Sequence, residues 1–499
     1  MSRWRAVSLS AICFASMVFG LLACTALPSP NPSPPSPTPE ATTPASPSPT
    51  AKETLPLASP KPTEQLRQSL PKYHLSALLD YDQHHLKVDE QILYFNRSTD
   101  SLSEILLLVE PNRYPGVFRL NSLDWEDGRP IGHYALETAQ LHLLLERPLS
   151  PGDSVRFSLS YELNLPQMGA PFGYTERQTN LADWYPFIPP YQDEQGWLVH
   201  ENALQGEHLA YDLADFQVEI RLSAPRSASG RTLTIAASAP AQTTEDGYRY
   251  QMEAARNFAW SVSDQYYQVL STSLDSTTIL SYSFPYHVKA DRPALDTTAQ
   301  AFSLYSKLFL PLPLKSLSVV EGDFLNGMEY HGLFFLSHAF YDYYTGTSEN
   351  NLIIIAAHET CHQWFFGLVG NDQALEPWLD EALATYCERL YYENIYGTKG
   401  AEWWWQNRVY FHQPQGWVDS TIYDHTEFKS YKDAVYLRGA LFLEDLRNRL
   451  GDEVFFAFLR DYLQRYAYLQ ATAEDFFAAL RDHTAADLSE LLNEYFAHR

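Results

Sequence analysis

Two histidines four residues apart, in the string His358-Glu359-Thr360-Cys361-His362, place strong limits on the local fold. On an α-helix, side chains at positions i and i+4 lie on one face, so both imidazoles can reach a single metal ion. Glu359 then lies beside them over the same cleft. Two imidazoles and one carboxylate would leave a fourth metal position open, as in catalytic zinc sites. The string therefore predicts a helix with two metal ligands and a carboxylate that can accept a proton.

The third ligand is expected from a second helix that returns toward the first. Residues 350–369, followed by Gly370, have the apolar pattern of one helix. The next helix begins near Pro377 and is predicted to end at Gly397, a candidate C-terminal cap. Glu381 lies in its first turns. Two antiparallel helices joined by a short turn would bring Glu381 to the two histidines.

The strings around these residues resemble the aminopeptidase N family of gluzincins, which also contains leukotriene hydrolase. Between His362 and Glu381 lie eighteen residues, which is the spacing of that family. The resemblance implies one zinc ion per chain, held by His358, His362 and Glu381, and Glu359 as the general base. The similar strings are residues 358–365 (HETCHQWF), 369–372 (VGND) and 378–386 (WLDEALATY).

A further string, Asn326-Gly327-Met328-Glu329-Tyr330, resembles the Gly-x-Met-Glu-Asn motif on the edge strand of that family's cleft. The resemblance implies that Gly327, Met328 and Glu329 bind substrate, with Glu329 on the free α-amino group. A fixed carboxylate beside a metal can recognise an ammonium group and reject acylated or internal peptide bonds. Tyr330 stands where the family commonly has Asn, so the first specificity pocket is expected to have its own shape.

The string Tyr436-Leu437-Arg438-Gly439 resembles the family's Tyr-x-Lys-Gly helix start, with Arg in place of Lys. The resemblance implies that Tyr436 donates a hydrogen bond to the oxyanion, and Tyr431 is the alternative donor. A phenol can act in this way because it stays protonated at neutral pH. Asp372 and Glu388 are candidates for orienting a ligand histidine.

The fold class predicted is α+β and multidomain. Residues 66–275 contain alternating apolar runs separated by turn signals, which predicts an antiparallel β domain, a saddle or a sandwich. Residues 276–499 are expected to form a thermolysin-like, mainly helical zinc peptidase domain with C-terminal helices. Residues 182–186 and 195–197 either lie near the cleft, as the resemblance implies, or belong to the aromatic core. Many relatives continue with a large helical domain, so we expect a more open cleft here.

Residues 1–24 have the pattern of a signal peptide with a lipobox. Arg3 and Arg5 precede an apolar run, and Leu21-Leu22-Ala23-Cys24 would leave a lipidated Cys24 after cleavage. The alternatives are a plain secretory signal or an uncleaved anchor. Residues 25–65 are rich in Pro, Ser and Thr, and we expect them to be a disordered linker. We therefore expect a lipoprotein anchored to a bacterial membrane, facing the cell surface or the periplasm.

Cysteine usage leaves one question open. Cys361 and Cys387 are expected to pack as small buried side chains, with a disulfide between them as the alternative in an oxidising compartment. The balance of 61 acidic against 35 basic residues, a net charge of −26, argues against a nucleic-acid partner.

The function expected is removal of N-terminal residues from peptides with a free N-terminus, by a zinc-dependent aminopeptidase. Two alternatives stay open: a surface-anchored endopeptidase, and a catalytically inactive peptide-binding lipoprotein. The intact set of six residues that would carry the chemistry favours the enzyme, and Glu329 favours the aminopeptidase. The six are His358, Glu359, His362, Glu381, Glu329 and Tyr436.

Overall fold

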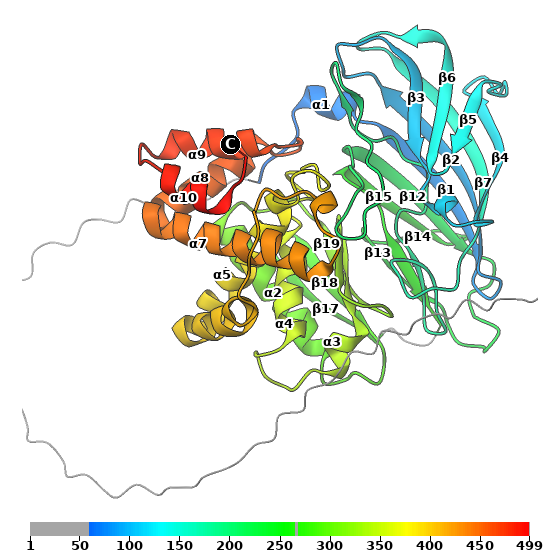
Figure 1. Ribbon diagram of the computed structural model, residues 1–499. Coiled ribbons are helices and arrows are strands. Elements are labelled where there is room, and N and C mark those ends of the chain that lie inside the picture. Colours follow the sequence, from blue (N-terminus) through cyan, green and yellow to red (C-terminus); the bar gives the residue numbers. More distant parts are fainter. Residues whose placement is uncertain (1–58, 265–267, 499) are drawn as a thin grey trace, which may run out of the picture. The chain divides into compact units, whose positions relative to one another are not determined.

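The computed structural model describes residues 59–264 and 268–498. The predicted signal peptide, and the linker as far as residue 58, lie outside the described residues. By its internal contacts the chain divides into two units, with the boundary after Leu55. All the helices and strands described below belong to the second unit, Pro56–Arg499 (Figure 1). Within the described part of the chain, no helix is long and apolar enough to cross a membrane.

A seven-stranded sheet of order β14-β15-β12-β1-β2-β7-β4 forms most of the N-terminal half. β1 and β12 run parallel, and the other neighbours are antiparallel. Alternate residues of these strands are buried, as Leu86, Val88 and Ile92 are on β2, because successive side chains of a strand point to opposite faces. The strands are β1 Lys72–Asp80, β2 His85–Phe95, β4 Phe118–Trp125, β7 Ser154–Asn164, β12 Ala214–Leu222, β14 Gln242–Thr243 and β15 Tyr248–Ala255.

Three smaller sheets accompany it, with the orders β3-β6-β5, β13-β16-β9-β8 and β10-β11. Leu107 and Leu143 of the first share one hydrophobic cluster with Leu75 and Ile92 of the large sheet, so the two sheets enclose a common core. Their strands are β3 Leu102–Leu108, β5 Tyr134–Glu137, β6 Gln140–Leu149, β8 Phe172–Tyr174, β9 Thr179–Leu181, β10 Tyr191–Gln192, β11 Gly196–Trp197, β13 Thr234–Ala237 and β16 Trp260–Ser263.

The C-terminal half opens with a mixed five-stranded sheet of order β17-β18-β19-β21-β20. β20 pairs only with β21, antiparallel, and is therefore an edge strand with free backbone groups on its other side. This geometry suits the pairing of an extended peptide with that edge. The strands are β17 Gln268–Leu274, β18 Thr277–Ser283, β19 Ser316–Gly322, β20 Gly327–Tyr330 and β21 Leu333–Ser337.

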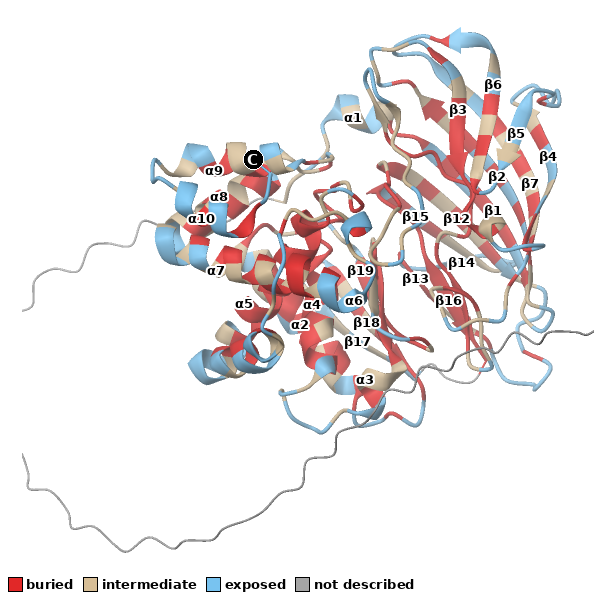
Figure 2. Ribbon diagram, in the orientation of Figure 1, coloured by how far each residue is buried: buried red, intermediate tan, exposed pale blue. Residues whose placement is uncertain are grey.

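Helices make up the rest of this half, and α4 and α5 are the most buried of them (Figure 2). α2 packs against α4 and β18, and α7 packs against α5. The helices are α1 Glu64–Ser69, α2 Asp291–Leu308, α3 His338–Asp342, α4 Asn351–Cys361, α5 Trp378–Trp404, α6 Phe428–Tyr431, α7 Gly439–Leu450, α8 Asp452–Arg465, α9 Ala473–His483 and α10 Ser489–Tyr495. Single turns lie at η1 Glu110–Arg113, η2 Trp405–Val409, η3 Tyr410–His412, η4 Ile422–Asp424 and η5 Lys432–Arg438.

The predicted fold class is confirmed, with two corrections to helix boundaries. The first helix ends at Cys361 and not near residue 369, because the chain turns there and the Gly367 amide donates to the His362 carbonyl. The second helix continues past Gly397 to Trp404. Gly397 has a φ of +69° and marks a kink, where a residue without a Cβ is favoured, but helix resumes after it.

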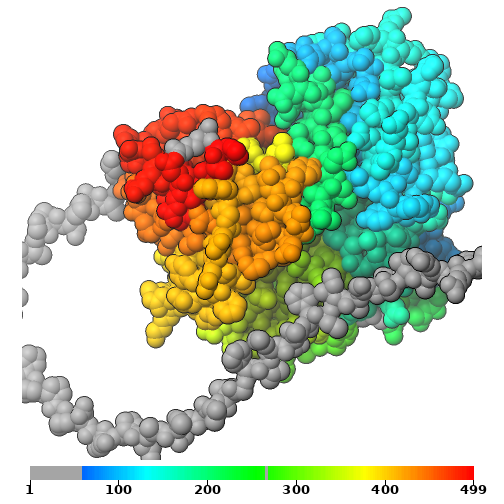
Figure 3. Space-filling view, in the orientation of Figure 1, coloured from blue at the N-terminus to red at the C-terminus, as the bar shows by residue number. Residues whose placement is uncertain are grey.

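Contacts join the two halves around one buried arginine. The Arg256 guanidinium donates to the carbonyls of Tyr211, Phe366 and Leu469, the first before β12 and the other two in the C-terminal half. On the face seen in Figure 3, the orange surface of the C-terminal half meets the green surface of the N-terminal half. The Tyr423 hydroxyl donates to the Glu201 carbonyl across this boundary.

Candidate active site

The two motif histidines lie at the C-terminal end of α4. The Asn350 side chain accepts from the Leu352 amide and caps the start of the helix. His358 and His362 are both buried, and their Nε2 atoms lie 3.1 Å apart. Although α4 ends at Cys361, His362 keeps helical dihedral angles, so the i, i+4 relation holds.

Glu381 returns to the histidines from the first turn of α5. Its Oε2 atom lies 3.1 Å from His358 Nε2 and 3.7 Å from His362 Nε2. The helix starts after Pro377, whose ring suits the first turn. The three groups that the sequence reasoning assigned as ligands are therefore brought together, and each is at least 95% buried.

Hydrogen bonds to the outer ring nitrogens orient both imidazoles. His358 Nδ1 lies 3.0 Å from Glu388 Oε1, and His362 Nδ1 donates to the Phe365 carbonyl at 3.2 Å. Burial would raise the pKa of Glu388, but Arg408 and His358 outweigh it and hold that pKa below its usual range. Glu388 is thus an ionised acceptor, and His358 donates to it. Each histidine is left with its Nε2 atom facing Glu381.

This donor set fits a zinc ion. The two Nε2 atoms lie 3.1 Å apart beside the carboxylate of Glu381. Burial would lower the pKa of His358, but Glu381 and Glu388 outweigh it and raise that pKa to about 10, so this cluster of groups favours a bound cation. Burial lowers the pKa of His362 to about 4, so its ring is neutral, as a metal ligand requires. Two imidazoles and one carboxylate are the ligand types that catalytic zinc sites use.

Glu359 lies beside this group, at the wall formed by β20. An added Cβ on Gly327 would collide with Glu359 Oε1 and with Ile355, so the strand approaches the carboxylate as closely as a residue without a side chain allows. Burial raises the pKa of Glu359 to about 8, and the charges of Glu381 and Glu207 add to the rise. Its Oε2 atom has no hydrogen-bond partner among the described residues.

Glu329 lies on the same edge strand. Its Oε1 atom accepts from Gln373 Nε2 at 2.9 Å, and the same nitrogen donates to Asp380 Oδ2 at 2.9 Å. Its carboxylate, that of Glu359 and a ring nitrogen of His362 lie within 4.8 Å of one another. Burial raises the pKa of Glu329 well above its usual range, with Glu207 the next largest cause. A positively charged partner would be strongly favoured here.

Glu207 is a site residue that the sequence reasoning missed. It follows Gly206 in the segment between β11 and β12, and its buried Oε2 atom has no hydrogen-bond partner among the described residues. Burial raises the pKa of Glu207 to about 8, and Glu381 adds to the rise. Its segment carries neither a periodic pattern nor a motif. Only the glycine before it hinted at a close approach, since a Cβ there would meet Tyr431.

The structure distinguishes between the two tyrosines proposed as oxyanion donors. The Tyr436 ring stacks on His358 at 5.9 Å between centroids, and its hydroxyl helps to lower the pKa of Glu381. Tyr431 is fully buried and packs edge-on against Tyr436 at 5.5 Å. Tyr436 lines the cavity over the histidines, and Tyr431 does not. Tyr436 lies in η5, a π-helical turn.

These residues surround a cavity of about 360 Å³, here called the motif cavity. Its walls come from the loop after β7, from β20, α4 and α5, and from the segment that leads into α7. Both halves of the chain contribute, because Pro171 and Glu207 precede the five-stranded sheet. The lining includes Glu207, Gly327, Met328, Glu329, His358, Glu359, His362, Glu381, Arg408, Lys432 and Tyr436.

Three other expectations are resolved by the structure. Asp372 is not a partner of the ligand histidines, since it pairs with His200 at 2.9 Å, so that candidate was wrong and Glu388 has the role instead. Cys361 and Cys387 are joined in a disulfide between α4 and α5, and are not unpaired core residues. Of the aromatic segment 182–186, Trp184 and Tyr185 lie in the core, while Ala182 and Asp183 line a second cavity.

Comparisons with known proteins place this chain beside zinc peptidases. Residues 293–495 match the Peptidase family M1 domain. The chain is 29% identical over 223 residues to Aminopeptidase M1-D of Oryza sativa subsp. japonica, which covers 40% of this chain and 25% of that protein. It is 25% identical over 288 residues to Aminopeptidase N of Lactobacillus delbrueckii subsp. lactis, 52% of this chain and 34% of that protein.

A solved structure supports the fold. The M1 zinc metallopeptidase from Deinococcus radiodurans superposes with a TM-score of 0.60 at 20% identity, covering 86% of this chain and 94% of that chain. The matches to the plant aminopeptidases span about a quarter of those proteins. All the motifs that resemble the aminopeptidase N family of gluzincins lie within the residues that match the Peptidase family M1 domain, and the solved neighbour is a zinc metallopeptidase.

Proposed function

We propose that the protein is a zinc-dependent aminopeptidase that removes N-terminal residues from peptides. One observation carries this proposal: the carboxylate of Glu329, on an edge strand, lies within 4.8 Å of a His362 nitrogen and of the Glu359 carboxylate. A fixed anion at this distance from the reacting groups suits a substrate whose positive charge lies next to the bond that is cut. The free α-amino group of a peptide has that position.

His358, His362 and Glu381 would hold the zinc ion. When bound, it supplies Lewis-acid activation of a water molecule and of the substrate carbonyl. Glu359 is the general base, because it lies next to His358 in the chain and close to His362, and its Oε2 atom has no hydrogen-bond partner among the described residues. It takes the water's proton and passes it to the leaving nitrogen. Tyr436 donates its hydroxyl proton in a hydrogen bond to the carbonyl oxygen as negative charge develops there.

Glu329 and Glu207 would bind the α-amino group. Both line the motif cavity, and each is in an environment that raises the pKa of its carboxyl and disfavours an unpaired negative charge. An ammonium group between them relieves this penalty. An N-acetylated peptide has no charge at this position, and its acetyl group would occupy the space. The site would therefore exclude internal peptide bonds.

The test compares hydrolysis of aminoacyl and peptide substrates with that of their N-acetylated counterparts, using the zinc-loaded chain. We expect cleavage of free-amine substrates alone. Equal cleavage of both would make the protein an endopeptidase, and cleavage of neither, with zinc bound, would favour a peptide-binding protein.

Glu359→Gln should keep zinc bound and lower kcat by roughly a hundredfold or more, because the proton acceptor is lost while the packing is kept. Zinc content by atomic emission and turnover are measured together. The matched control is Glu444→Gln, a partly buried carboxylate on α7 that binds Tyr386 and Arg389. Full activity of a zinc-replete Glu359→Gln protein would refute the role of Glu359.

We further propose that Cys24 carries a lipid anchor and that the catalytic part lies outside the cytoplasm. The support is the sequence of residues 1–24 and the proline-rich residues that follow. Metabolic labelling with a radioactive fatty acid in a bacterial host should mark the wild-type chain and not Cys24→Ala. Equal labelling of both, or of neither, would contradict the lipid anchor.

A further inference from the structure

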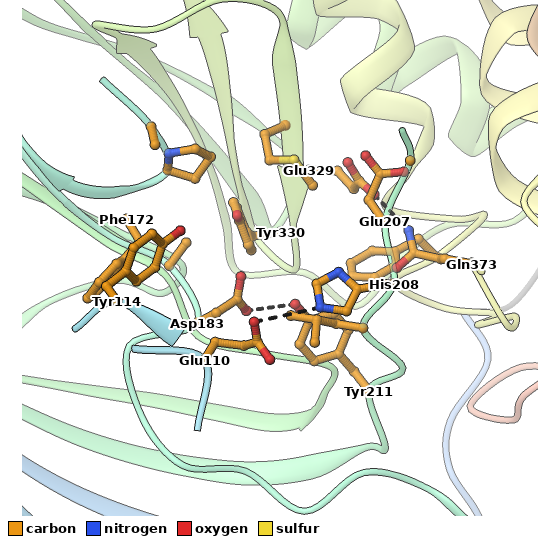
Figure 4. A pocket seen from close by; sticks show the side chains of 17 residues that line it. Glu110, Tyr114, Phe172, Asp183, Glu207, His208, Tyr211, Glu329, Tyr330 and Gln373 are labelled. Atoms are coloured by element: carbon orange, nitrogen blue, oxygen red, sulfur yellow. Dashed lines mark hydrogen bonds and ion pairs between the residues drawn. The ribbon is translucent and has the colours of Figure 1, made fainter. Parts of the chain in front are cut away.

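A second cavity opens beside the motif cavity. It has a volume of about 250 Å³ and shares Pro171, Glu207, Met328 and Glu329 with the motif cavity (Figure 4). We call it the acidic pocket. It is lined by Glu110, Tyr114, Ala170, Pro171, Phe172, Ala182, Asp183, Gly206, Glu207, His208, Leu209, Tyr211, Met328, Glu329, Tyr330, Phe366 and Gln373.

The ionisable side chains that line the acidic pocket are mainly acidic. It contains four carboxylates and one histidine, and neither lysine nor arginine. Figure 4 shows Asp183 and Glu110 close together, at a distance from Glu329 and Glu207. Glu329 and Glu207 form the end of the pocket that is shared with the motif cavity, and Asp183 and Glu110 belong to the acidic pocket alone.

Glu110 and Asp183 each have a carboxylate oxygen that can accept a hydrogen bond from a ligand. Glu110 is 91% buried, and its Oε1 atom has no hydrogen-bond partner among the described residues. Its Oε2 atom accepts from Arg113 Nε at 2.7 Å and lies 3.7 Å from His208 Nε2. Asp183 accepts from the Tyr211 hydroxyl at 2.6 Å through Oδ1, which leaves Oδ2 for another donor. A buried carboxylate oxygen without a donor is costly, so a cationic ligand would be stabilised here.

Both groups carry negative charge at neutral pH. Burial raises the pKa of Asp183 to about 6, which is still below neutrality. Burial would also raise the pKa of Glu110, but His208 and Arg113 outweigh it and lower that pKa. Arg113 and His208 neutralise part of the charge of Glu110, whereas Asp183 has only a neutral hydroxyl as its partner.

Aromatic rings form much of the remaining wall. Tyr114 and Phe172 stack with ring centroids 5.9 Å apart, and Tyr330, Tyr211 and Phe366 also line the pocket. Aromatic faces attract cations and pack well against the methylene stem of lysine or arginine. An acidic end combined with aromatic walls suits a long side chain with a positively charged tip. An acidic side chain would find no partner of opposite charge at that end.

We propose that the acidic pocket receives the side chain of the substrate's N-terminal residue and selects arginine or lysine. This inference rests on the proposed function, because it takes the α-amino group to be bound between Glu329 and Glu207. The side chain leaves the same Cα that carries the amino group and the scissile carbonyl. With the carbonyl in the motif cavity, the shared carboxylates direct the side chain into the adjoining pocket, toward Asp183 and Glu110.

The experiment uses the zinc-loaded full chain and aminoacyl-4-nitroanilides of arginine, lysine, citrulline, norleucine and glutamate. Citrulline matches arginine in shape and lacks its charge, so the arginine-to-citrulline ratio of kcat/KM reports the charge alone. We expect a ratio of roughly ten or more. Asp183→Asn keeps an acceptor for Tyr211 and should lower this ratio at least tenfold, and Glu110→Gln should lower it by a smaller factor. Glu146→Gln, an exposed carboxylate on β6, should leave it unchanged.

A second readout does not require turnover. Calorimetric titration with arginine amide and citrulline amide should give tighter binding of arginine amide, and Asp183→Asn should remove the difference. If no substrate is cut but this preference is seen, the proposed function fails and the pocket assignment stands. If citrulline equals arginine in both assays, the pocket assignment fails while aminopeptidase activity stands. Melting temperatures show whether each variant is folded.

Discussion

Gly327 shows how one missing side chain can determine the position of Glu359, the proposed general base. Its backbone lies so close to Glu359 that an added Cβ would collide with Oε1. Gly327→Ala should therefore displace the carboxylate or the edge strand, and because misplacement by about 1 Å costs roughly a hundredfold, kcat/KM should fall by about that factor. Steady-state kinetics and zinc content would be measured together, and zinc should stay bound.

The matched control is Gly132→Ala, because nothing lies within 4 Å of a Cβ at that glycine. It should keep wild-type kinetics. If Gly327→Ala were as active as Gly132→Ala, the close packing of β20 against Glu359 would have no catalytic importance.

Glu388 is a positioning residue for the metal site. It accepts from His358, and Arg408 and Trp404 Nε1 hold it in place with hydrogen bonds of 2.9 Å. Glu388→Gln keeps the shape of the side chain and removes the charge, so we expect zinc affinity to fall roughly 10–100-fold. Competition with a chelator measures the affinity. Glu393→Gln, on the same helix and paired with Arg389 and Arg447, is the control and should bind zinc normally.

At the scale of elements, the zinc site depends on the relative position of α4 and α5. Tyr305 on α2 contributes to this, because its hydroxyl is shared between the carbonyls of Ala357 at 3.2 Å and Cys387 at 2.9 Å. The disulfide Cys361–Cys387 joins the same two helices, with the Cα atoms 6.3 Å apart. One helix carries two ligands and the other carries the third, so both connections stabilise the metal geometry.

Loss of the disulfide should lower the free energy of unfolding by about 2–4 kcal/mol, because the reduced unfolded chain gains conformational freedom. Urea unfolding of wild type should shift with reductant, and unfolding of the Cys361→Ala/Cys387→Ala double variant should not. Peptide mapping by mass spectrometry checks the bond directly. Recovery of both cysteines as free thiols from unreduced protein would contradict the pairing.

At the scale of the whole molecule, the N-terminal β-rich half is both a support and a part of the site. It contributes Glu207 to the motif cavity, and Glu110 and Asp183 to the acidic pocket. The core of this half also contains a fully buried glutamate. Glu90 lies on the inward face of β2, between Val88 and Ile92.

Burial raises the pKa of Glu90 well above its usual range, and the Tyr161 hydroxyl offsets this only in part. Below the unfolded pKa of about 4.3 the carboxyl is protonated in both the folded and the unfolded state, and stability is at its full value. As the pH rises from there toward the raised folded-state pKa, the free energy of unfolding falls. Glu90→Gln stays neutral at every pH. It should therefore raise the melting temperature over wild type by several degrees at pH 8, and by less at pH 5.

Thermal unfolding at the two pH values measures this effect. Asp89→Asn is the control, because Asp89 is the exposed neighbour on the opposite face of the same strand. An equal shift at pH 5 and pH 8 for Glu90→Gln would show that the effect is one of packing and not of ionisation.

Much of the site was predictable because its parts have local signatures. The i, i+4 histidines, the proline at the start of α5 and the alternation along β2 each depend on neighbours within a few residues, where helix and strand periodicity act directly. The sequence therefore predicted residues that the structure brings together in the motif cavity: His358, His362, Glu381, Glu359, Glu329 and Tyr436. The end of α4 was missed, since the turn after Cys361 depends on packing and not on a capping signal.

Other features were decided only by tertiary structure. Glu207 and Glu110 come from segments without periodicity or motif, and Asp183 comes from residues 182–186, which the sequence left either near the cleft or in the aromatic core. All three gain their importance from the cavities into which the fold brings them. The pairing of Asp372 with His200 joins residues 172 positions apart, and the bond between Cys361 and Cys387 depends on the packing of two helices. By itself the sequence determined the metal chemistry, because that chemistry is local to two helices. The tertiary structure decided which charges surround it, because those come from distant parts of the chain.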